Sequence, residues 1–475
     1  MKRLLLLPML FCCLGLFASD TDSILIRMNC HAAEMPQFVE QFFANPALKY
    51  YSFDTPFSSI SAGYRHRHDN QIIVPEEGDG ASEKSFSAEG FMPAGNSSAV
   101  WGDAAYTAGK TCNVQWCESA DPQIIYPYFT ADATGGDFYT ESYRFAGGYS
   151  RQLKPFTWGA TLGYTASHQY RNVDPRPRNV TGKLTLSVGM AYSITTDYML
   201  GTSLEWLKYK QSNEIKFVSE THEEPVYQLT GLGMHYFRFD GASKISDFSG
   251  NRYGAVLSLY PLHSGWLMNL MLHRFTFGKT LRDLNKLPLA SVWHNSLELT
   301  AGYKHDANRF SYAVTAFFDA SRRHGSEAIF GDATSGSYPL IGSLEMYADN
   351  RYKTGVRGLL SYSQGIRTYS LTAVCNYSHR KSSYAEPELH EIVEGVEGMA
   401  KISVRSLLGK KWYGGVGLTS YHFQSVTRCR TGLELNLARA MTDKYAIGIA
   451  LAASICNYYG EARSNSYNIQ INLNF

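Results

Sequence analysis

Long apolar runs are missing from most of this sequence. Beyond its first twenty residues, the 475-residue chain never reaches the stretch of about 18 apolar residues that a membrane-spanning helix needs. Charge is scarce too: Asp, Glu, Lys and Arg make up 18% of residues, against about a quarter in an ordinary soluble domain. The formal net charge is only +2. Because nucleic-acid-binding proteins carry a marked basic excess, we expect no nucleic-acid partner.

Cysteine is too rare for a disulfide-stabilised fold. After the N-terminal segment, the cysteines are scattered along the chain: Cys30, Cys112, Cys117, Cys375, Cys429 and Cys456. Only Cys112 and Cys117 lie close together, in a segment expected to form a loop, and they predict one local disulfide. No second cysteine pair or neighbouring histidine completes a zinc ligand set, so we expect no metal site.

Common catalytic and cofactor motifs are missing as well. The sequence has no G-x-S-x-G elbow, no H-E-x-x-H pair, no C-x-x-C pair and no phosphate-binding glycine loop. We therefore predict no catalytic residue and no cofactor. An enzyme that assembles its site from residues far apart in the sequence would escape this search.

What the chain does have is aromatic residues and strict alternation. Aromatics make up 14% of residues, including 33 tyrosines, which suit the boundary between membrane and water. In the last ten residues, an apolar set alternates with the amides Asn468, Gln470, Asn472 and Asn474. The apolar set is Tyr467, Ile469, Ile471, Leu473 and Phe475. Because a strand points successive side chains to opposite faces, this segment is predicted to be a strand with one apolar and one polar face.

This ending resembles the C-terminal insertion signal of bacterial outer-membrane β-barrel proteins, which closes the barrel with a strand ending in Phe. The resemblance implies the outer membrane of a Gram-negative bacterium as location, surrounding lipid, and the barrel-assembly machinery as partner during insertion. The other end agrees. Lys2-Arg3, an apolar stretch over 4–17 and Ala18-Ser19 predict a secretory signal peptide over 1–19.

The same alternation recurs along the whole chain. We identify eighteen segments: 57–66, 84–91, 98–107, 138–151, 155–170, 181–193, 197–210, 251–261, 265–278, 293–304, 308–319, 351–363, 367–379, 398–408, 411–423, 427–438, 442–456 and 465–475. Counting back from Phe475, every second gap is short and most of the others are long, including 211–250, 320–350 and 380–397. Outer-membrane barrels likewise have short periplasmic turns and longer outer loops.

The sequence therefore predicts an all-β, transmembrane, antiparallel up-and-down barrel of about 18 strands, with 14 to 20 as the range and both termini periplasmic. Closure follows because backbone groups on an open edge cannot be satisfied in lipid. Residues 57–475 are assigned to the barrel. Residues 20–56 are assigned to a periplasmic leader with a short helix over 32–45. With this number of strands the lumen can hold a channel or a plug.

Six cations are predicted to face the lumen from alternate strands of one sector: Lys353, Arg357, Lys401, Arg405, Arg428 and Arg430. They predict a basic patch that favours anionic solutes. The alternative is a solvated ladder in which inward carboxylates such as Glu434 neutralise them. The glutamates of the predicted loop 380–397 are expected to form a solvated face, with calcium binding as the less favoured alternative.

A family resemblance rests on three elements: the stretch 42–48, which contains Asn45-Pro46-Ala47-Leu48, the segment 123–128 (Gln-Ile-Ile-Tyr-Pro-Tyr), and the Phe-terminated closing strand. With these the chain resembles an uncharacterised family of outer-membrane β-barrel proteins from Bacteroidota, which implies the barrel but no activity. The Asn-Pro-Ala element also occurs near the start of fatty-acid-transport-like barrels. Here it is interpreted as a simple helix stop.

Two functions remain open from the sequence. The first is a channel or transporter for small, potentially anionic solutes. The second is a structural or partner-binding barrel without transport activity, serving surface lipoproteins or other envelope proteins through 211–250 and 320–350. An outer-membrane hydrolase with a rim site is a weaker third alternative.

Overall fold

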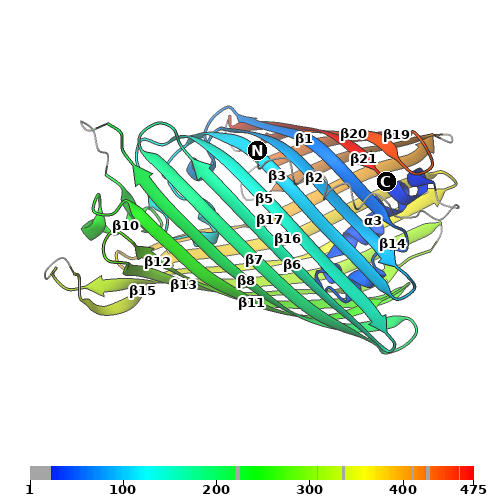
Figure 1. Cartoon of the computed structure of the whole chain (residues 1–475), viewed down its shortest axis with the longest axis horizontal. Helices are drawn as coiled ribbons and strands as arrows, with labels where there is room; N and C mark the ends of the chain where they lie inside the picture. The colour runs from blue at the N-terminus through cyan, green and yellow to red at the C-terminus, as the bar shows by residue number, and fades with distance from the viewer. Residues whose placement is uncertain are drawn as a thin grey trace, which may run out of the picture.

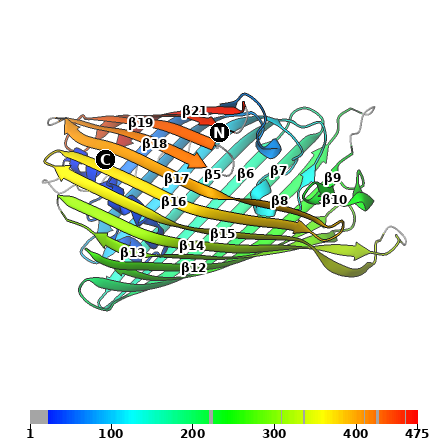
Figure 2. The ribbon, with the colours of Figure 1, turned by 180° about the vertical axis from the view of Figure 1, so that it is seen from behind.

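The computed structural model describes residues 23–219, 225–307, 309–333, 337–408, 411–423, 428–458 and 461–475. They form an 18-stranded antiparallel sheet that closes into a barrel where β1 pairs with β21 (Figures 1 and 2). No helix within these ranges is long and apolar enough to cross a membrane. The barrel strands are β1 Phe57–Asp69, β2 Gly80–Ala94, β3 Ser98–Val114, β5 Gly136–Leu153, β6 Phe156–Tyr170, β7 Arg176–Ser193, β8 Tyr198–Lys216, β11 Ile245–Pro261, β12 Gly265–Leu281, β13 Leu287–His305, β14 Phe310–Phe330, β15 Leu340–Gln364, β16 Arg367–Tyr384, β17 Leu389–Leu408, β18 Trp412–Phe423, β19 Arg428–Ala440, β20 Ala446–Asn457 and β21 Arg463–Asn474.

Each of the eighteen predicted segments overlaps one of these strands, so the predicted barrel and its strand number are confirmed. The two ends of the barrel differ. At the turn end, where β1 begins and β21 ends, neighbouring strands are joined by short turns. At the other, the loop end, strands extend much further. β15 has 25 residues and, together with β14, projects beyond its neighbours (Figure 2).

Most of two predicted loops is strand in the structure, which is a correction. The segment 320–350 continues β14 and β15, and 380–397 continues β16 and β17. Glu391, Glu394 and Glu397 therefore lie on β17 rather than in a loop. The prediction ended these strands too early because it required an apolar face. A ladder that extends past the lipid keeps its hydrogen bonds but no longer needs apolar side chains outside.

The outer face of the barrel carries exposed apolar side chains that a soluble protein would bury. Leu162, Leu204 and Ile402 are 57%, 62% and 57% exposed. On the closing strand, Ile471 is 55% exposed whereas the inward Asn474 is 4% exposed, as the alternation predicts. A continuous outward apolar surface of this kind is what lipid contacts in a transmembrane barrel.

Residues 23–56, the N-terminal insert, lie inside the turn end (Figure 1). They form α2 Ile24–His31, α3 Glu34–Phe38 and the 3₁₀ turns η1 Glu40–Ala44 and η2 Leu48–Tyr51. The single helix predicted over 32–45 corresponds to two short elements in the structure, the five-residue α3 and the 3₁₀ turn η1. The insert buries one apolar side against inward residues of the barrel: Met35, Phe38, Val39, Phe42 and Leu48 pack on Ala191, Met199, Tyr260, Leu267, Ala313 and Leu359.

A second segment, residues 115–135, folds into the loop end and is called the loop insert. It contains α4 Pro122–Ile125 and β4 Thr130–Ala131, which pairs with β9 Tyr227–Gly231. β9 in turn pairs with β10 Met234–His235. The short turns η3 Pro75–Glu77 and η4 Phe237–Phe239 lie at the same end. The insert packs its apolar side chains, Ile125, Tyr128 and Phe129, against inward residues of four strands: Tyr209, Phe248, Phe275, Phe277 and Val292.

Candidate functional site: a lumen with two inserts

The N-terminal insert sits on three glycines of neighbouring strands. Gly159 on β6, Gly189 on β7 and Gly201 on β8 all face Asn45-Pro46-Ala47. A Cβ on Gly159 would overlap the backbone of Pro46 and come within 2.6 Å of Ala47 N. Asn45 is fully buried, and its Oδ1 accepts a hydrogen bond from the Ala47 N–H at 3.0 Å. The sequence element interpreted as a helix stop does end η1, and it also fits a seat in the barrel wall.

Two of the six predicted lumen cations hold this insert in place. Arg405 pairs with Glu34 of α3 and donates from Nη1 to the backbone oxygen of Asn29 at 3.0 Å. Arg357 donates to the Phe38 carbonyl at 3.0 Å, and its guanidinium lies 4.4 Å from the centre of the Phe38 ring. An ion pair with a partly buried carboxylate and a cation–π contact both depend on geometry, so these two arginines fix the orientation of the N-terminal insert in the lumen.

The other described members of the predicted basic patch have partners on the wall itself. Lys353 pairs with Glu397 at 3.2 Å and Lys401 with Glu434 at 2.7 Å. Arg430 donates to Ser454 Oγ at 3.3 Å. The side chain of Arg428 lies outside the described residues. The six positions therefore do not act as one patch, because two fasten the insert and two are neutralised by carboxylates.

The predicted disulfide between Cys112 and Cys117 is wrong, since both are free thiols in the structure. Cys112 lies on β3, whereas Cys117 is buried in the loop insert, where its thiol donates to the Ser119 carbonyl at 3.2 Å. Short spacing suggested the pair, but the chain turns between them and the second thiol faces the core of the insert instead.

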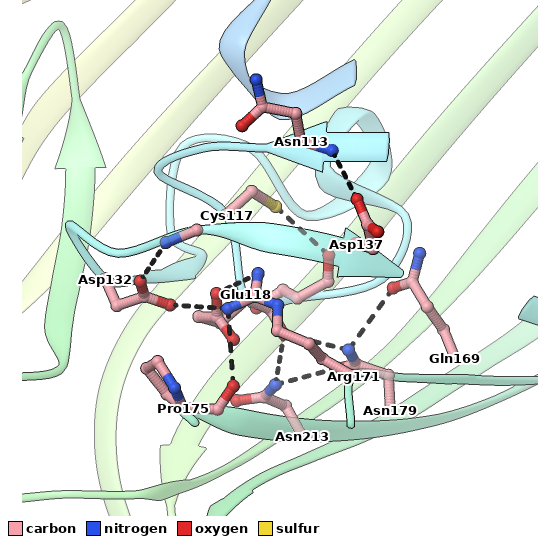
Figure 3. A network of polar contacts seen from close by, with 12 residues as sticks. Asn113, Cys117, Glu118, Asp132, Asp137, Gln169, Arg171, Pro175, Asn179 and Asn213 are labelled. Atoms are coloured by element: carbon pink, nitrogen blue, oxygen red, sulfur yellow. Dashed lines mark hydrogen bonds and ion pairs between the residues drawn. The ribbon is translucent and has the colours of Figure 1, made fainter. Parts of the chain in front are cut away.

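The loop insert is fastened by a buried ionic network around Arg171 (Figure 3). Arg171 Nη2 lies 2.7 Å from Glu118 Oε1 and Arg171 Nη1 lies 3.3 Å from Asp132 Oδ2, and all three side chains are at most 1% exposed. Two amides of the wall, Asn179 and Asn213, donate to the Glu118 carbonyl at 2.9 and 2.7 Å. One arginine thus faces two buried carboxylates, which leaves the group one positive charge short.

Protonation resolves this imbalance. Burial raises the pKa of Glu118 well above its usual value, and the neighbouring Asp132 raises it further, while Arg171 opposes the shift. Burial would also raise the pKa of Asp132, but the hydrogen bond with Glu118, the Gly135 N–H and Arg171 outweigh it and lower that pKa. The docked network therefore keeps a proton on Glu118 and a charge on Asp132.

This assignment predicts a pH dependence of loop docking. Because the docked state holds a proton that a solvated Glu releases near a pKa of about 4.3, docking should weaken as pH rises from that value towards the raised pKa of Glu118. The Asp132 contribution has the opposite sign and is lost only in acid, below about pH 3.9. Hydrogen exchange of residues 115–135 between pH 5 and 9, corrected for intrinsic rates, measures this. Glu118→Gln should flatten the profile, and an unchanged slope in that variant would contradict the assignment.

Two cavities lie along the sector of the lumen formed by β17–β21, β1 and β2. The N-terminal insert borders this sector at the turn end, where Ile24 and Leu25 of α2 pack on Tyr413, Ala438 and Ala446. The loop-side cavity, of about 680 Å³, is bounded by β1, β2 and β17–β21. Its charged lining is Arg65, Arg67, Lys401, Arg430, Glu83 and Glu434. The turn-side cavity, of about 500 Å³, lies between the N-terminal insert and β2, β3 and β18–β21, and its polar lining includes His31, Glu40, Lys49, Glu89, Asp103 and Asn472.

The two cavities follow one another along the same strands. On β19, the inward Glu434 lines the loop-side cavity and the next inward residue, Asn436, lines the turn-side cavity. On β21, Asn468 lines the first, Asn472 the second, and Gln470 lies between them. The inward amides predicted from the closing strand thus lie on the barrel wall along which the two cavities follow one another.

Sequence reasoning found Lys401 and Arg430 at this wall but missed Arg65, Arg67 and Glu83. β1 pairs with β21, so residues at opposite ends of the chain share one surface. Alternation over 57–66 placed Arg65 on a strand, and closing the barrel with 465–475 would have put it beside Asn468, its partner across the ladder. The glycine seat was missed as well, since nothing local shows which inward glycines face another segment.

Comparison with known proteins defines the family. The chain matches a family of unknown function, DUF6850, over residues 46–475, and belongs to it. No curated protein matches. Among solved structures, the chain is similar to the ferric-catecholate import receptor Fiu from E. coli K12, with 8% identity and a TM-score of 0.42, covering 89% of this chain and 82% of the other. It is also similar to BauA, the ferric preacinetobactin receptor from Acinetobacter baumannii, with 10% identity, a TM-score of 0.44, and coverage of 89% and 80%.

Proposed function

We propose that this protein is a gated outer-membrane transporter for small anionic solutes in a Gram-negative bacterium, with the turn end in the periplasm and the loop end outside. The observation that carries the proposal is the succession of two polar cavities along β19, β20 and β21. A solute that enters the loop-side cavity needs to pass only the level of Gln470 to reach the turn-side cavity. At the turn end, Ile24 and Leu25 of α2 pack on Tyr413, Ala438 and Ala446 of this sector. The N-terminal insert therefore borders the route there and has to move for the route to open.

The charge of the route supports an anionic solute. The loop-side cavity has four cationic residues and two carboxylates in its lining, a balance of +2. The turn-side cavity has Glu40, Glu89 and Asp103 against Lys49, a balance of −2 with His31 neutral. In a water-filled cavity with low-dielectric walls such fields are focused. An anion would therefore be concentrated in the loop-side cavity, and the negative turn-side cavity would be a barrier to its onward passage while the N-terminal insert is in place.

Gating follows from the inserts. Each insert is held by apolar clusters and a few charged contacts with the wall and contributes no strand to the barrel sheet, so its movement would leave the hydrogen bonds between the barrel strands intact. Movement of the N-terminal insert from Arg405 and Arg357 would widen the turn-side cavity into the periplasm. A ligand that binds better to the moved state would shift the population towards it.

The charge of the loop-side cavity predicts ion selectivity. Arg65→Glu/Arg430→Glu changes its balance from +2 to −2 and should shift the permeability ratio severalfold towards cations, measured as the reversal potential in planar bilayers under a KCl gradient. The control is Arg252→Glu, on β11 and so outside the cavity-lining strands, where Arg252 pairs with Glu205 at 2.6 Å. An equal shift in this control would count against a route along β19–β21.

A partner-binding barrel is the second candidate, favoured by the tip of the β14–β15 hairpin. Leu340, Ile341 and Leu344 are 57%, 71% and 55% exposed, on the part of β15 that projects past neighbouring strands. Apolar side chains exposed in water beyond the lipid suit a protein partner. The partner-binding function is favoured if planar-bilayer recordings show no current for the native barrel and none for a variant whose N-terminal insert is displaced.

A further inference from the structure

The outer surface of the barrel has a hollow of about 700 Å³ across β8 and β11–β15, separate from the lumen. These strands are consecutive neighbours in the sheet, and β12 to β15 run side by side in Figure 2. Its floor is low because small residues, Ala255 on β11 and Ala320 on β14, alternate across the ladder with larger ones. The larger residues are Leu204, Leu272, Leu297 and Tyr352. All of these face outwards, so the floor is apolar.

Two arginines line the loop-end edge of this floor. The register places Tyr253, Arg274, Asn295 and Arg322 opposite one another on four consecutive strands. Arg274 and Arg322 are both exposed. On β12 the outward series from Trp266 to Leu272 is apolar and Arg274 is the next outward residue. A transmembrane strand needs about 9–11 residues to cross the hydrocarbon layer. Counted from Trp266, Arg274 is the ninth residue, so we expect the two arginines to lie at the boundary between the hydrocarbon layer and the headgroups.

The guanidinium of Arg322 is held in place by two neighbouring side chains, Trp293 and His324. Its guanidinium lies 5.9 Å from the centre of the Trp293 ring, and its Nε donates to His324 Nε2 at 2.5 Å. The Trp293 and His324 rings stack at 4.1 Å. The nearby Glu345 binds His324 instead, at 3.2 Å. Within the described part of the chain, neither Arg274 nor Arg322 forms an ion pair, so both retain donors for an anion.

We propose that this hollow binds a phosphorylated lipid of the outer leaflet, with its phosphate across Arg274 and Arg322 and an acyl chain on Ala255 and Ala320. The two arginines are two strands apart, about 10 Å along the sheet, so their long side chains reach one phosphate or two on a single headgroup. A free phosphate would use the cationic edge only. The apolar floor directly beside that edge matches a ligand that is charged at one end and apolar at the other.

The test compares lipid retention in the full-length folded barrel. Arg274→Gln/Arg322→Gln should bind diphosphorylated lipid A about ten- to a hundredfold more weakly than wild type in native mass spectrometry titrations, because two charge-assisted contacts are lost. Lys84→Gln/Arg439→Gln removes the same charge at outward positions away from the hollow, on β2 and β19, and should bind like wild type. Ala320→Phe fills the floor and should weaken lipid binding while both arginines stay.

The remaining arms separate the sources of phosphate. Lipid A without phosphates, and phosphatidylcholine, should bind wild type weakly and show no difference between the variants. Inorganic phosphate at millimolar concentration should not displace lipid A. Folding of each variant is checked by its heat-modifiable migration. Equal lipid A binding by wild type and Arg274→Gln/Arg322→Gln would overturn the proposal, as would displacement by inorganic phosphate or wild-type affinity in Ala320→Phe.

Discussion

Gly159→Val is expected to turn a closed barrel into one that conducts persistently. The substitution leaves every charged contact of the N-terminal insert in place and alters only the space beneath it. A Cβ at position 159 would collide with the backbone at Pro46 and Ala47, and backbone cannot rotate aside as a flexible side chain can. Because the seat lies between strands of a closed sheet, the insert must lift rather than the wall recede.

The size of the effect follows from how the insert is held. Asn45 and Leu48 are buried against Gly189 and Gly201, the next two strands, so lifting Pro46 also removes those contacts. Overpacking a close-fitting site costs about 1–3 kcal/mol. Since about 1.4 kcal/mol is a factor of ten, this raises the population of the lifted state roughly five- to 150-fold. In planar bilayers, wild type should show rare openings, whereas Gly159→Val should show long ones with higher mean current.

Gly163→Val provides the matched control. Gly163 lies on the same strand and faces the same way, but the nearest atom to an added Cβ is 3.6 Å away, at Ala146, and belongs to no insert. This variant should conduct as wild type does. If both valines open the barrel, the cause is a general disturbance of β6. If neither does, the N-terminal insert is not the barrier to ions.

The success of the fold prediction and the failure of the loop prediction have one physical origin. Lipid demands an apolar outer face, so each segment inside the membrane shows its alternation, and the closing strand at 467–475 shows it without exception. Outside the lipid that demand ends. β15 continues for several residues on the loop side of Tyr352 with polar side chains on both faces, and nothing in the local pattern distinguishes this strand from a loop.

The candidate site was harder to predict because it depends on contacts between distant segments. Lys401 and Arg405 are alike in sequence, because both are inward cations of β17 and they lie four residues apart. One pairs with Glu434 on the wall and the other with Glu34, some 370 residues away. Only the path of the N-terminal insert decides between these roles. That path depends in turn on the glycine seat, which has no local signature.

Arg171→Met is expected to release the loop insert from the lumen. Arg171 is the only cation in ionic contact with Glu118 and Asp132 among the described residues, and its loss leaves the buried charge of Asp132 without a cation. Breaking a buried ion pair from one side costs about 3–5 kcal/mol. Protonation of both acids reduces this cost, so the effect should be largest at neutral and higher pH, where the Asp132 charge persists.

Limited proteolysis with chymotrypsin measures the release. The loop insert contains no lysine or arginine, but Tyr128 and Phe129 are 1% and 2% exposed when it is docked and become cleavable when it leaves. Cleavage at these two residues should rise by at least tenfold in Arg171→Met if even about 1.4 kcal/mol of the docking energy is lost. The barrel itself should stay folded by heat-modifiable migration.

Arg176→Met is the matched control, since Arg176 pairs with Asp174 at 2.6 Å near the same end of β7 but is 42% exposed. Exposed pairs contribute about 0–1 kcal/mol, so this variant should resist chymotrypsin as wild type does. Because Glu118 is already protonated in the docked state, Asp132 carries the one uncompensated charge, and adding Asp132→Asn to Arg171→Met should restore part of the protection. Protection unchanged in Arg171→Met would mean that the apolar contacts of Ile125, Tyr128 and Phe129 hold the insert without the ionic network.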